Sequence, residues 1–191
     1  MRHATTSRDF FDAMYQRNPD PWNFESSPYE KGRYSAILNA LEGRHYLRAF
    51  EPGCSVGILT QALASYCDWL DAVDISPTAV LRASQRCKHL PNIHIQCGSL
   101  PEAIPDCKFD LVVFSEIGYY FEREELRTII RRLSDGLSCG GVLLAVHWLG
   151  TSSDHLLGGD EVHDIIREND NLYLDSEEHY PLFRLDRMVS I

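Results

Sequence analysis

The stretch Glu51-Pro52-Gly53-Cys54-Ser55-Val56-Gly57 decides the fold that this sequence predicts. It follows a predicted strand over residues 45–50 and precedes a predicted helix over 58–66, and its glycines permit a sharp turn between the two. A second predicted strand, over 69–73, ends at Asp74. An acid about 20 residues after such a glycine turn is placed to accept hydrogen bonds from both hydroxyls of a ribose.

Strands and helices continue to alternate along the rest of the chain. We expect further helices over 7–16, 27–41, 76–87, 123–133 and 160–168, and further strands over 93–96, 109–114 and 141–146. The strands are continuous apolar runs, which is typical of a parallel sheet covered on both faces. Two segments with alternating polarity, near 172–176 and 183–190, predict an antiparallel edge hairpin in which each strand has one wet face.

The predicted fold class is therefore a three-layer α/β/α, Rossmann-like domain with a mostly parallel seven-stranded sheet. We expect a single domain over residues 1–191, in which a helical N-terminal lid over 1–45 precedes a cofactor-binding core over 46–191. The linker-like segment 18–28 contains Trp22 and should pack against the core. Its end, Ser27-Pro28-Tyr29-Glu30, has the form of a capping box, with Ser27 at the N-cap and Glu30 reaching back to it.

Composition excludes several classes of protein. The 191 residues carry a net charge of −10, which disfavours a nucleic-acid partner. The longest apolar runs are too short to span a membrane, and the polar segment around residues 2–9 has no apolar signal-peptide core. Six cysteines without a C-x-x-C pair predict reduced thiols and a cytoplasmic location, and no metal site is expected.

The glycine turn favours one class of cofactor over another. A dinucleotide fingerprint requires G-x-G-x-x-G after the strand, but here Ser55 takes the middle position and no third glycine fits. A nicotinamide oxidoreductase is therefore a distant alternative. Glu51, just ahead of the glycines, would repel a pyrophosphate but suits a ligand with an ammonium and a sulfonium.

At these residues the sequence resembles the class I S-adenosylmethionine-dependent methyltransferases, whose first motif is an acid followed by G-x-G-x-G. The resemblance covers nearly the whole chain and includes the fourth strand, which ends at Ser115-Glu116, and the turn Leu137-Ser138-Cys139-Gly140-Gly141-Val142-Leu143. It implies S-adenosyl-L-methionine as cofactor and S-adenosyl-L-homocysteine as product. Ser55 departs from the motif, and Ser99 stands where the family usually has an Asp facing the adenine.

A narrower resemblance rests on three further segments: Asp20-Pro21-Trp22, the stretch from Tyr29 to Tyr34, and Glu116-Ile117-Gly118-Tyr119-Tyr120. These look like the nodulation S type of methyltransferase, which N-methylates the free amino sugar at the non-reducing end of a chitin-like oligosaccharide. The thiopurine and tellurite methyltransferases share the Pro-Trp lid. The resemblance thus implies an amino sugar or chitooligosaccharide as substrate.

The implied site residues fall into two groups. As catalytic residues we expect Glu116, His147 and Tyr120, the first two as candidate proton acceptors for the amine. As cofactor-binding residues we expect Trp22, Tyr29, Arg33, Glu51, Gly53, Gly57, Asp74, Ile75, Ser99, Leu100 and Ser115.

The sequence also permits other residue roles and other functions. Tyr34 is equally well explained as a packing residue, and Asp160, Glu161 and His163 are further candidates for the proton acceptor. The protein could instead methylate a small thiol or oxyanion, or bind the cofactor without catalysis. Oligomeric state does not follow from the sequence.

Overall fold

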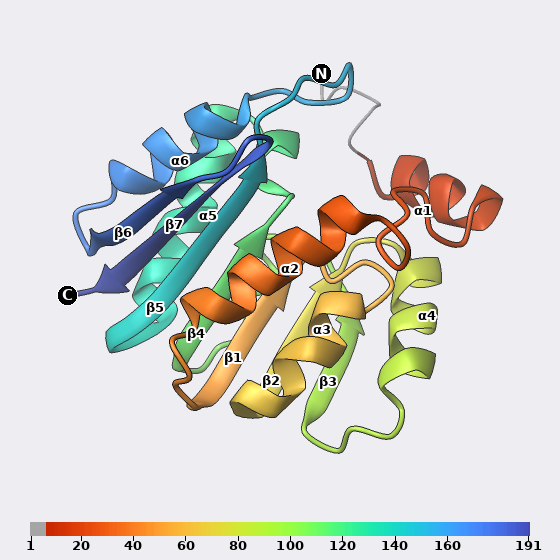
Figure 1. The fold of residues 1–191 in the computed structure, drawn as a ribbon, viewed down its shortest axis with the longest axis horizontal. Coiled ribbons are helices and arrows are strands. Elements are labelled where there is room, and N and C mark those ends of the chain that lie inside the picture. Colours follow the sequence, from red (N-terminus) through yellow and green to blue (C-terminus); the bar gives the residue numbers. More distant parts are fainter. Residues whose placement is uncertain (1–6) are drawn as a thin grey trace.

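The computed structural model describes residues 7–191 of the chain. Seven strands form one sheet in the order β3-β2-β1-β4-β5-β7-β6 (Figure 1). The strands are β1 (Tyr46–Pro52), β2 (Cys67–Asp74), β3 (Ile93–Cys97), β4 (Phe109–Ser115), β5 (Leu137–Trp148), β6 (Leu172–His179) and β7 (Phe183–Ser190). The helices are α1 (Arg8–Arg17), α2 (Pro28–Ala40), α3 (Ile58–Leu63), α4 (Pro77–Cys87), α5 (Arg123–Gly136) and α6 (Gly159–Arg167), with 3-10 turns η2 (Ala64–Tyr66) and η3 (Gly118–Tyr120).

The first five strands are parallel, and β7 pairs antiparallel with both β5 and β6. This confirms the predicted fold class, including the antiparallel hairpin at the C-terminal edge. Strand order reverses between β1 and β4, and the carboxyl ends on either side of that reversal are where such sheets bind ligands.

Alternation along the buried strands builds two cores. In β4, Val112 and Phe114 pack against α5 and α6, whereas Leu111 and Val113 pack against α2 and α3. The sheet is therefore covered on both faces, as continuous apolar strands require. Figure 1 shows α2 and α3 on one side of the sheet and α5 on the other.

Two local expectations are wrong. Ser27 is the N-cap residue of α2, as expected, but its side chain makes no capping hydrogen bond. Glu30 is buried and pairs with Arg33 instead, because a guanidinium forms a stronger hydrogen bond with a carboxylate than a neutral backbone amide does. In β7 neither face is wet: all eight residues are buried, including Arg184 and Asp186, which pair with each other.

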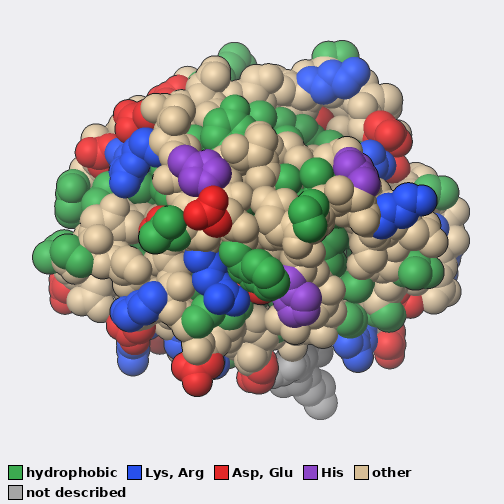
Figure 2. Space-filling model, turned by 90° about the horizontal axis from the view of Figure 1, so that it is seen from below, with side chains coloured by type: hydrophobic (Ala, Val, Ile, Leu, Met, Phe, Trp, Pro, Cys, Tyr) green, Lys and Arg blue, Asp and Glu red, His purple; other side chains and the backbone are tan. Residues whose placement is uncertain are grey.

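The surface fits the acidic composition. Seen from below, acidic and basic side chains are interspersed among apolar ones, and the described residues form no continuous basic patch on this face (Figure 2). No helix within residues 7–191 is long and apolar enough to cross a membrane. The absence of a signal peptide was predicted largely from residues 2–6, which lie outside the described part. All six cysteines are free; Cys54, Cys67 and Cys87 are buried, whereas Cys97 and Cys139 are exposed.

Candidate active site

A cavity of about 1040 Å³ opens at the carboxyl ends of β1, β2 and β4. A smaller pocket of about 40 Å³ adjoins it and shares part of its lining, including Gly53, Ser115 and Glu116. Ligand pockets usually measure about 300–1,000 Å³. The larger cavity therefore has room for a cofactor together with part of a second molecule.

The structure brings most of the predicted site residues to these two pockets. The larger cavity is lined by Trp22, Gly53, Asp74, Ile75, Ser99, Leu100, Ser115, Glu116 and Tyr120. Arg33 and Glu51 line the smaller pocket. Three predicted residues, Tyr29, Gly57 and His147, line neither.

Two of these three have packing contacts that explain their place. Tyr29 packs edge-on against Phe183, with ring centroids 6.0 Å apart. Gly57 has a φ of +80° just before α3, and a Cβ there would lie 2.9 Å from the Cα of Ala83 on α4. Gly57 is thus required by the turn and by the approach of α4.

Glu51 is the most unusual group of the smaller pocket. It is 3% exposed, and its Oε2 has no hydrogen-bond partner within the described chain. Burial raises the pKa of this carboxyl to about 8. An unpaired buried carboxylate oxygen beside a pocket is complementary to a cationic ligand group, such as an ammonium.

Asp74 lies at the end of β2 and organises the neighbouring turn. One carboxylate oxygen accepts from the amide of Ser55 at 2.8 Å and the other from the amide of Ser76 at 2.9 Å. Burial raises its pKa to about 6, against the effect of these backbone hydrogen bonds. Ser55 itself has a φ of +51°, so a serine takes the left-handed conformation where the motif has its central glycine.

Arg33 lines the smaller pocket and contacts side chains that line the larger cavity. It is 2% exposed, its Nε lies 3.1 Å from Glu30 Oε2, and its Nη1 donates to Ser115 Oγ at 2.8 Å. Nη1 also lies 3.6 Å from Glu116 Oε1. The guanidinium stands over the ring of Tyr34, 5.2 Å from its centroid. One buried cation therefore faces two carboxylates.

Glu116 is held firmly in the wall of the cavity. Its φ of +61° is left-handed, which is uncommon outside glycine. Oε2 accepts from the hydroxyl of Tyr119 at 2.8 Å, and Oε1 accepts from the amide of Trp148 at 2.8 Å. Burial raises its pKa, while Arg33 opposes that shift. A carboxylate with a raised pKa is a better proton acceptor than an ordinary one.

Helix α1 closes one side of the cavity. Asp12 accepts from Ser76 Oγ at 2.6 Å and from the amide of Thr78 at 2.9 Å, at the start of α4. Tyr15 donates to Ser55 Oγ at 2.6 Å. Arg82 of α4 donates to the carbonyl of Tyr15 at 2.9 Å. The first helix thus forms a wall of the cavity, whereas α2, also within the lid expected over residues 1–45, packs against the sheet.

Aromatic rings complete this wall. Trp22 lies edge-on to Tyr15 and stacks on Phe24, with centroids 5.5 Å apart in both pairs. Phe11 lies edge-on to Tyr120, 5.0 Å away. All five rings line the cavity.

Several lining residues were missed by the sequence reasoning. They are Ser7, Arg8, Phe11, Tyr15, Phe24, Glu30, Tyr119, Glu122, Glu125 and Leu156, among others. The available signal for Phe11 and Tyr15 was the apolar face that the helix predicted over 7–16 carries. The charge of the lining is predominantly negative: it includes one guanidinium, that of Arg8, and six carboxylates, those of Glu30, Asp74, Glu102, Glu116, Glu122 and Glu125.

The candidate His147 is buried behind the cavity instead of in it. Its exposed fraction is 0%, and its Nε2 accepts from the amide of Gly118 at 3.1 Å. The alternatives Asp160, Glu161 and His163 do not line either pocket. Glu116 is therefore the one candidate proton acceptor among these that faces the cavity. Within residues 7–191, no group of three or more His, Cys, Asp or Glu side chains could hold a metal ion.

Comparison with known proteins identifies relatives that match most of the chain. Residues 9–171 match the model of the nodulation protein S (NodS) family. Nodulation protein S of Sinorhizobium fredii is 32% identical over 124 residues, 64% of this chain and 57% of that protein. Nodulation protein S of Rhizobium tropici is 28% identical over 158 residues, 78% of this chain and 65% of that protein.

A solved structure also matches this chain over most of its length. The N-methyltransferase NodS from Bradyrhizobium japonicum, in complex with S-adenosyl-L-homocysteine, is 26% identical and superposes with a TM-score of 0.83. The match covers 94% of this chain and 97% of that one. The chain spans between 56% and 65% of the length of the first four curated relatives it matches.

Proposed function

Because the chain belongs to the nodulation protein S family, we propose that it transfers the methyl group of S-adenosyl-L-methionine to the nitrogen of an amino sugar. The proposed acceptor is the free amino group of a chitooligosaccharide, and S-adenosyl-L-homocysteine is the second product. The observation that carries the proposal is the unpaired, buried carboxylate oxygen of Glu51 next to Asp74 at the carboxyl ends of β1 and β2.

The lining residues fit this cofactor group by group. Asp74 would accept from the ribose hydroxyls, and Glu51 supplies the missing counter-charge for the ammonium. Arg33 would hold the carboxylate of the cofactor, and Ser99 and Leu100 would contact the adenine. Bound there, the cofactor supplies an activated methyl group on a sulfonium.

The acidic lining supports a cationic acceptor. Six carboxylates and one guanidinium line the larger cavity, so the field in it attracts an ammonium and repels an oxyanion. This disfavours the alternative of a thiolate or oxyanion as the methyl acceptor. A sugar amine, which is protonated in part near neutral pH, suits the field.

Glu116 is the residue we propose as proton acceptor. The amine must lose a proton before it can attack, because only the neutral form has a free lone pair. Glu116 would take that proton and leave a neutral amine, whose nitrogen could then accept the methyl group that the bound cofactor would supply, the electron pair of the broken carbon–sulfur bond staying on sulfur. Tyr119 and the amide of Trp148 hold the carboxylate in place, and Tyr120 lines the same wall.

The lid contributes by excluding water. α1 and the aromatic rings of Trp22 and Phe24 cover the cavity, so that the acceptor and methyl donor meet in a fixed geometry. We further propose a cytoplasmic location, which the six free thiols support.

A turnover assay tests the proposal. The protein is incubated with methyl-labelled S-adenosyl-L-methionine and, separately, with chitosan oligomers, glucosamine, small thiols and nucleosides. We expect label transfer to the amino sugars only. Transfer to a thiol alone would overturn the acceptor, and no transfer together with a thermal shift caused by S-adenosyl-L-homocysteine would indicate a non-catalytic binding protein.

A further inference from the structure

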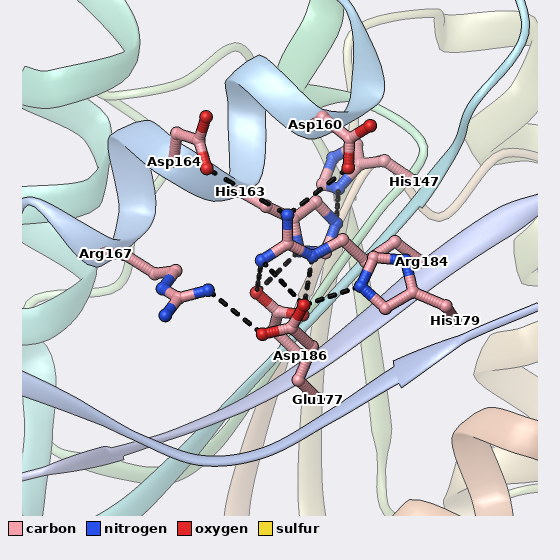
Figure 3. Close-up of polar contacts among 9 residues, drawn as sticks. All are labelled: His147, Asp160, His163, Asp164, Arg167, Glu177, His179, Arg184 and Asp186. Atoms are coloured by element: carbon pink, nitrogen blue, oxygen red, sulfur yellow. Dashed lines mark hydrogen bonds and ion pairs between the residues drawn. The ribbon is translucent and has the colours of Figure 1, made fainter.

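A row of buried polar side chains lies behind the cavity and takes no part in its lining. It runs from His147 on β5 through His163 on α6 to Asp186 and Arg184 on β7 (Figure 3). The two imidazoles are 0% exposed and Asp186 is 1% exposed. Buried charged and polar groups are costly unless each has a partner, so the row calls for an explanation.

The contacts along the row fix the position of each hydrogen. His147 Nε2 accepts from the amide of Gly118 at 3.1 Å, so this nitrogen carries no hydrogen. The hydrogen of the neutral ring is then on Nδ1, which faces His163 Nε2 at 3.3 Å. Because His163 Nε2 then accepts from His147, the hydrogen of His163 is placed on Nδ1, which lies within ion-pair distance of Asp186 Oδ2, at 3.1 Å, but is not aligned with it as a hydrogen bond.

Arg184 secures the far end of the row. It donates to both carboxylate oxygens of Asp186, at 2.9 and 2.8 Å. Nearer the surface, Arg184 also donates to Asp160 Oδ1 at 3.2 Å and lies 3.6 Å from Glu177. A bidentate pair of this kind orients the carboxylate, and the carboxylate orients the imidazole next to it.

The row does not conduct a proton to the cavity. It ends on the amide of Gly118, which donates a hydrogen bond but offers no lone pair to receive a proton. What the row can do is hold that piece of backbone. Gly118 is also closely packed, since an added Cβ would lie 2.8 Å from His147 Nε2 and 2.3 Å from Cγ1 of Val162, so no other residue fits there.

The held backbone is the segment that carries the reacting side chains. Residues 116–120 contain the left-handed Glu116 and its partner Tyr119, together with Tyr120. A left-handed glutamate is strained, and such a conformation persists only where the surroundings impose it. The bond from Gly118 to His147 is one of the contacts that impose it.

We infer that His147 is a positioning residue: as a neutral Nδ1–H imidazole, oriented by His163 and Asp186, it anchors the amide of Gly118 and so fixes Glu116 in the cavity. The effect on turnover rests on the proposed function; the hydrogen positions do not. Burial lowers the pKa of His147, and the neighbouring His163, Arg33 and His155 lower it further, which keeps the ring neutral.

The hydrogen positions can be tested on the unmodified protein. Long-range proton–nitrogen correlation spectra report which ring nitrogen of a histidine is protonated. We expect His147 to be neutral with its hydrogen on Nδ1, His163 to carry a hydrogen on Nδ1, and the amide of Gly118 to exchange slowly with deuterium. A hydrogen on Nε2 of His147, or a ring that is charged at pH 7, would overturn the inference.

Two variants then test the anchoring. His147→Gln keeps an acceptor near the position of Nε2, whereas His147→Leu removes it. We expect kcat to fall about 10²-fold in His147→Leu and to recover largely in His147→Gln, because small displacements of a reacting group cost about that much. The dissociation constant of S-adenosyl-L-homocysteine should change less than about twofold in both.

His179→Leu serves as the matched control. His179 contacts Glu177 at the exposed end of the same group of residues, so this substitution should leave kcat and Gly118 exchange unchanged (Figure 3). An equal loss in His179→Leu, a kcat loss accompanied by an equal loss of S-adenosyl-L-homocysteine affinity, or slow Gly118 exchange in His147→Leu would each refute anchoring. If the unmodified protein methylates no amine, the proposed function fails while the spectra still decide the hydrogen positions.

Discussion

Glu51→Gln should stabilise the unliganded protein and lower its affinity for the cofactor. Burial raises the pKa of Glu51 from 4.5 to about 8, so the folded state keeps a proton that the unfolded state has lost between these values. The free energy of unfolding of the parent therefore falls as pH rises through this window. At about 1.4 kcal/mol per pKa unit, the whole fall is about 4–5 kcal/mol.

Urea unfolding from pH 5.5 to 8.5 measures this effect. Glutamine does not titrate, so the stability of Glu51→Gln relative to the parent should grow by about 3 kcal/mol over this range. Asp74 has a raised pKa in both proteins, so its contribution largely cancels in the difference. Glu25→Gln, at an exposed ion pair with Arg86, is the control and should show no such growth.

The affinity for the cofactor should fall in Glu51→Gln, whereas the stability of the unliganded protein rises. The amide has no charge for the ammonium, so affinity for S-adenosyl-L-homocysteine should fall about tenfold to a hundredfold. In the parent, binding must ionise Glu51, and calorimetry at pH 7 in buffers of different ionisation enthalpy should detect a released proton that the variant lacks. Parallel pH profiles of stability, or equal affinities, would refute the reasoning.

Four further substitutions test other parts of the structure. Asp74→Asn leaves one backbone amide without its acceptor, so S-adenosyl-L-homocysteine affinity in calorimetry should fall about tenfold to a hundredfold and the melting temperature should also drop; unchanged affinity would place the ribose elsewhere. Glu116→Gln should lower kcat about 10²–10⁴-fold, with partial recovery at higher pH as more amine becomes neutral; a parental rate would remove it as proton acceptor. Gly57→Ala should cost about 1–3 kcal/mol in urea unfolding because of its positive φ and its contact with Ala83, whereas Gly32→Ala, in an open helical position, should stabilise by about 0.5–1 kcal/mol.

Features governed by local pattern could be predicted from the sequence. Apolar runs and turn residues located the strands, and Ser76-Pro77 marked the start of α4, where Ser76 accepts from the amide of Ala79 as an N-cap should. The acid at the end of β2 and the glycine turn lie at the cavity as expected. These features depend on residues close together in the chain.

Features governed by pairing between distant residues could not be predicted from the sequence. Arg184 and Asp186 look like the wet face of a strand, yet they neutralise each other and lie buried within the sheet. Glu30 fits a capping box but has Arg33 one turn away. A sequence shows which charges are present, whereas only the fold shows which of them meet.

The reversal of strand order between β1 and β4 divides the cavity into two separately encoded halves. Apart from the wall contributed by residues 7–30, residues 51–104 supply one half, which includes Gly53 and Asp74, and residues 115–156 supply the other, which includes Ser115, Glu116 and Tyr120. If the proposed roles hold, we expect substitutions confined to residues 116–156 to alter the choice of acceptor more than the affinity for the methyl donor. The architecture thus lets a lineage acquire new acceptors without rebuilding its donor site, and it gives protein engineers a natural boundary for chimeras.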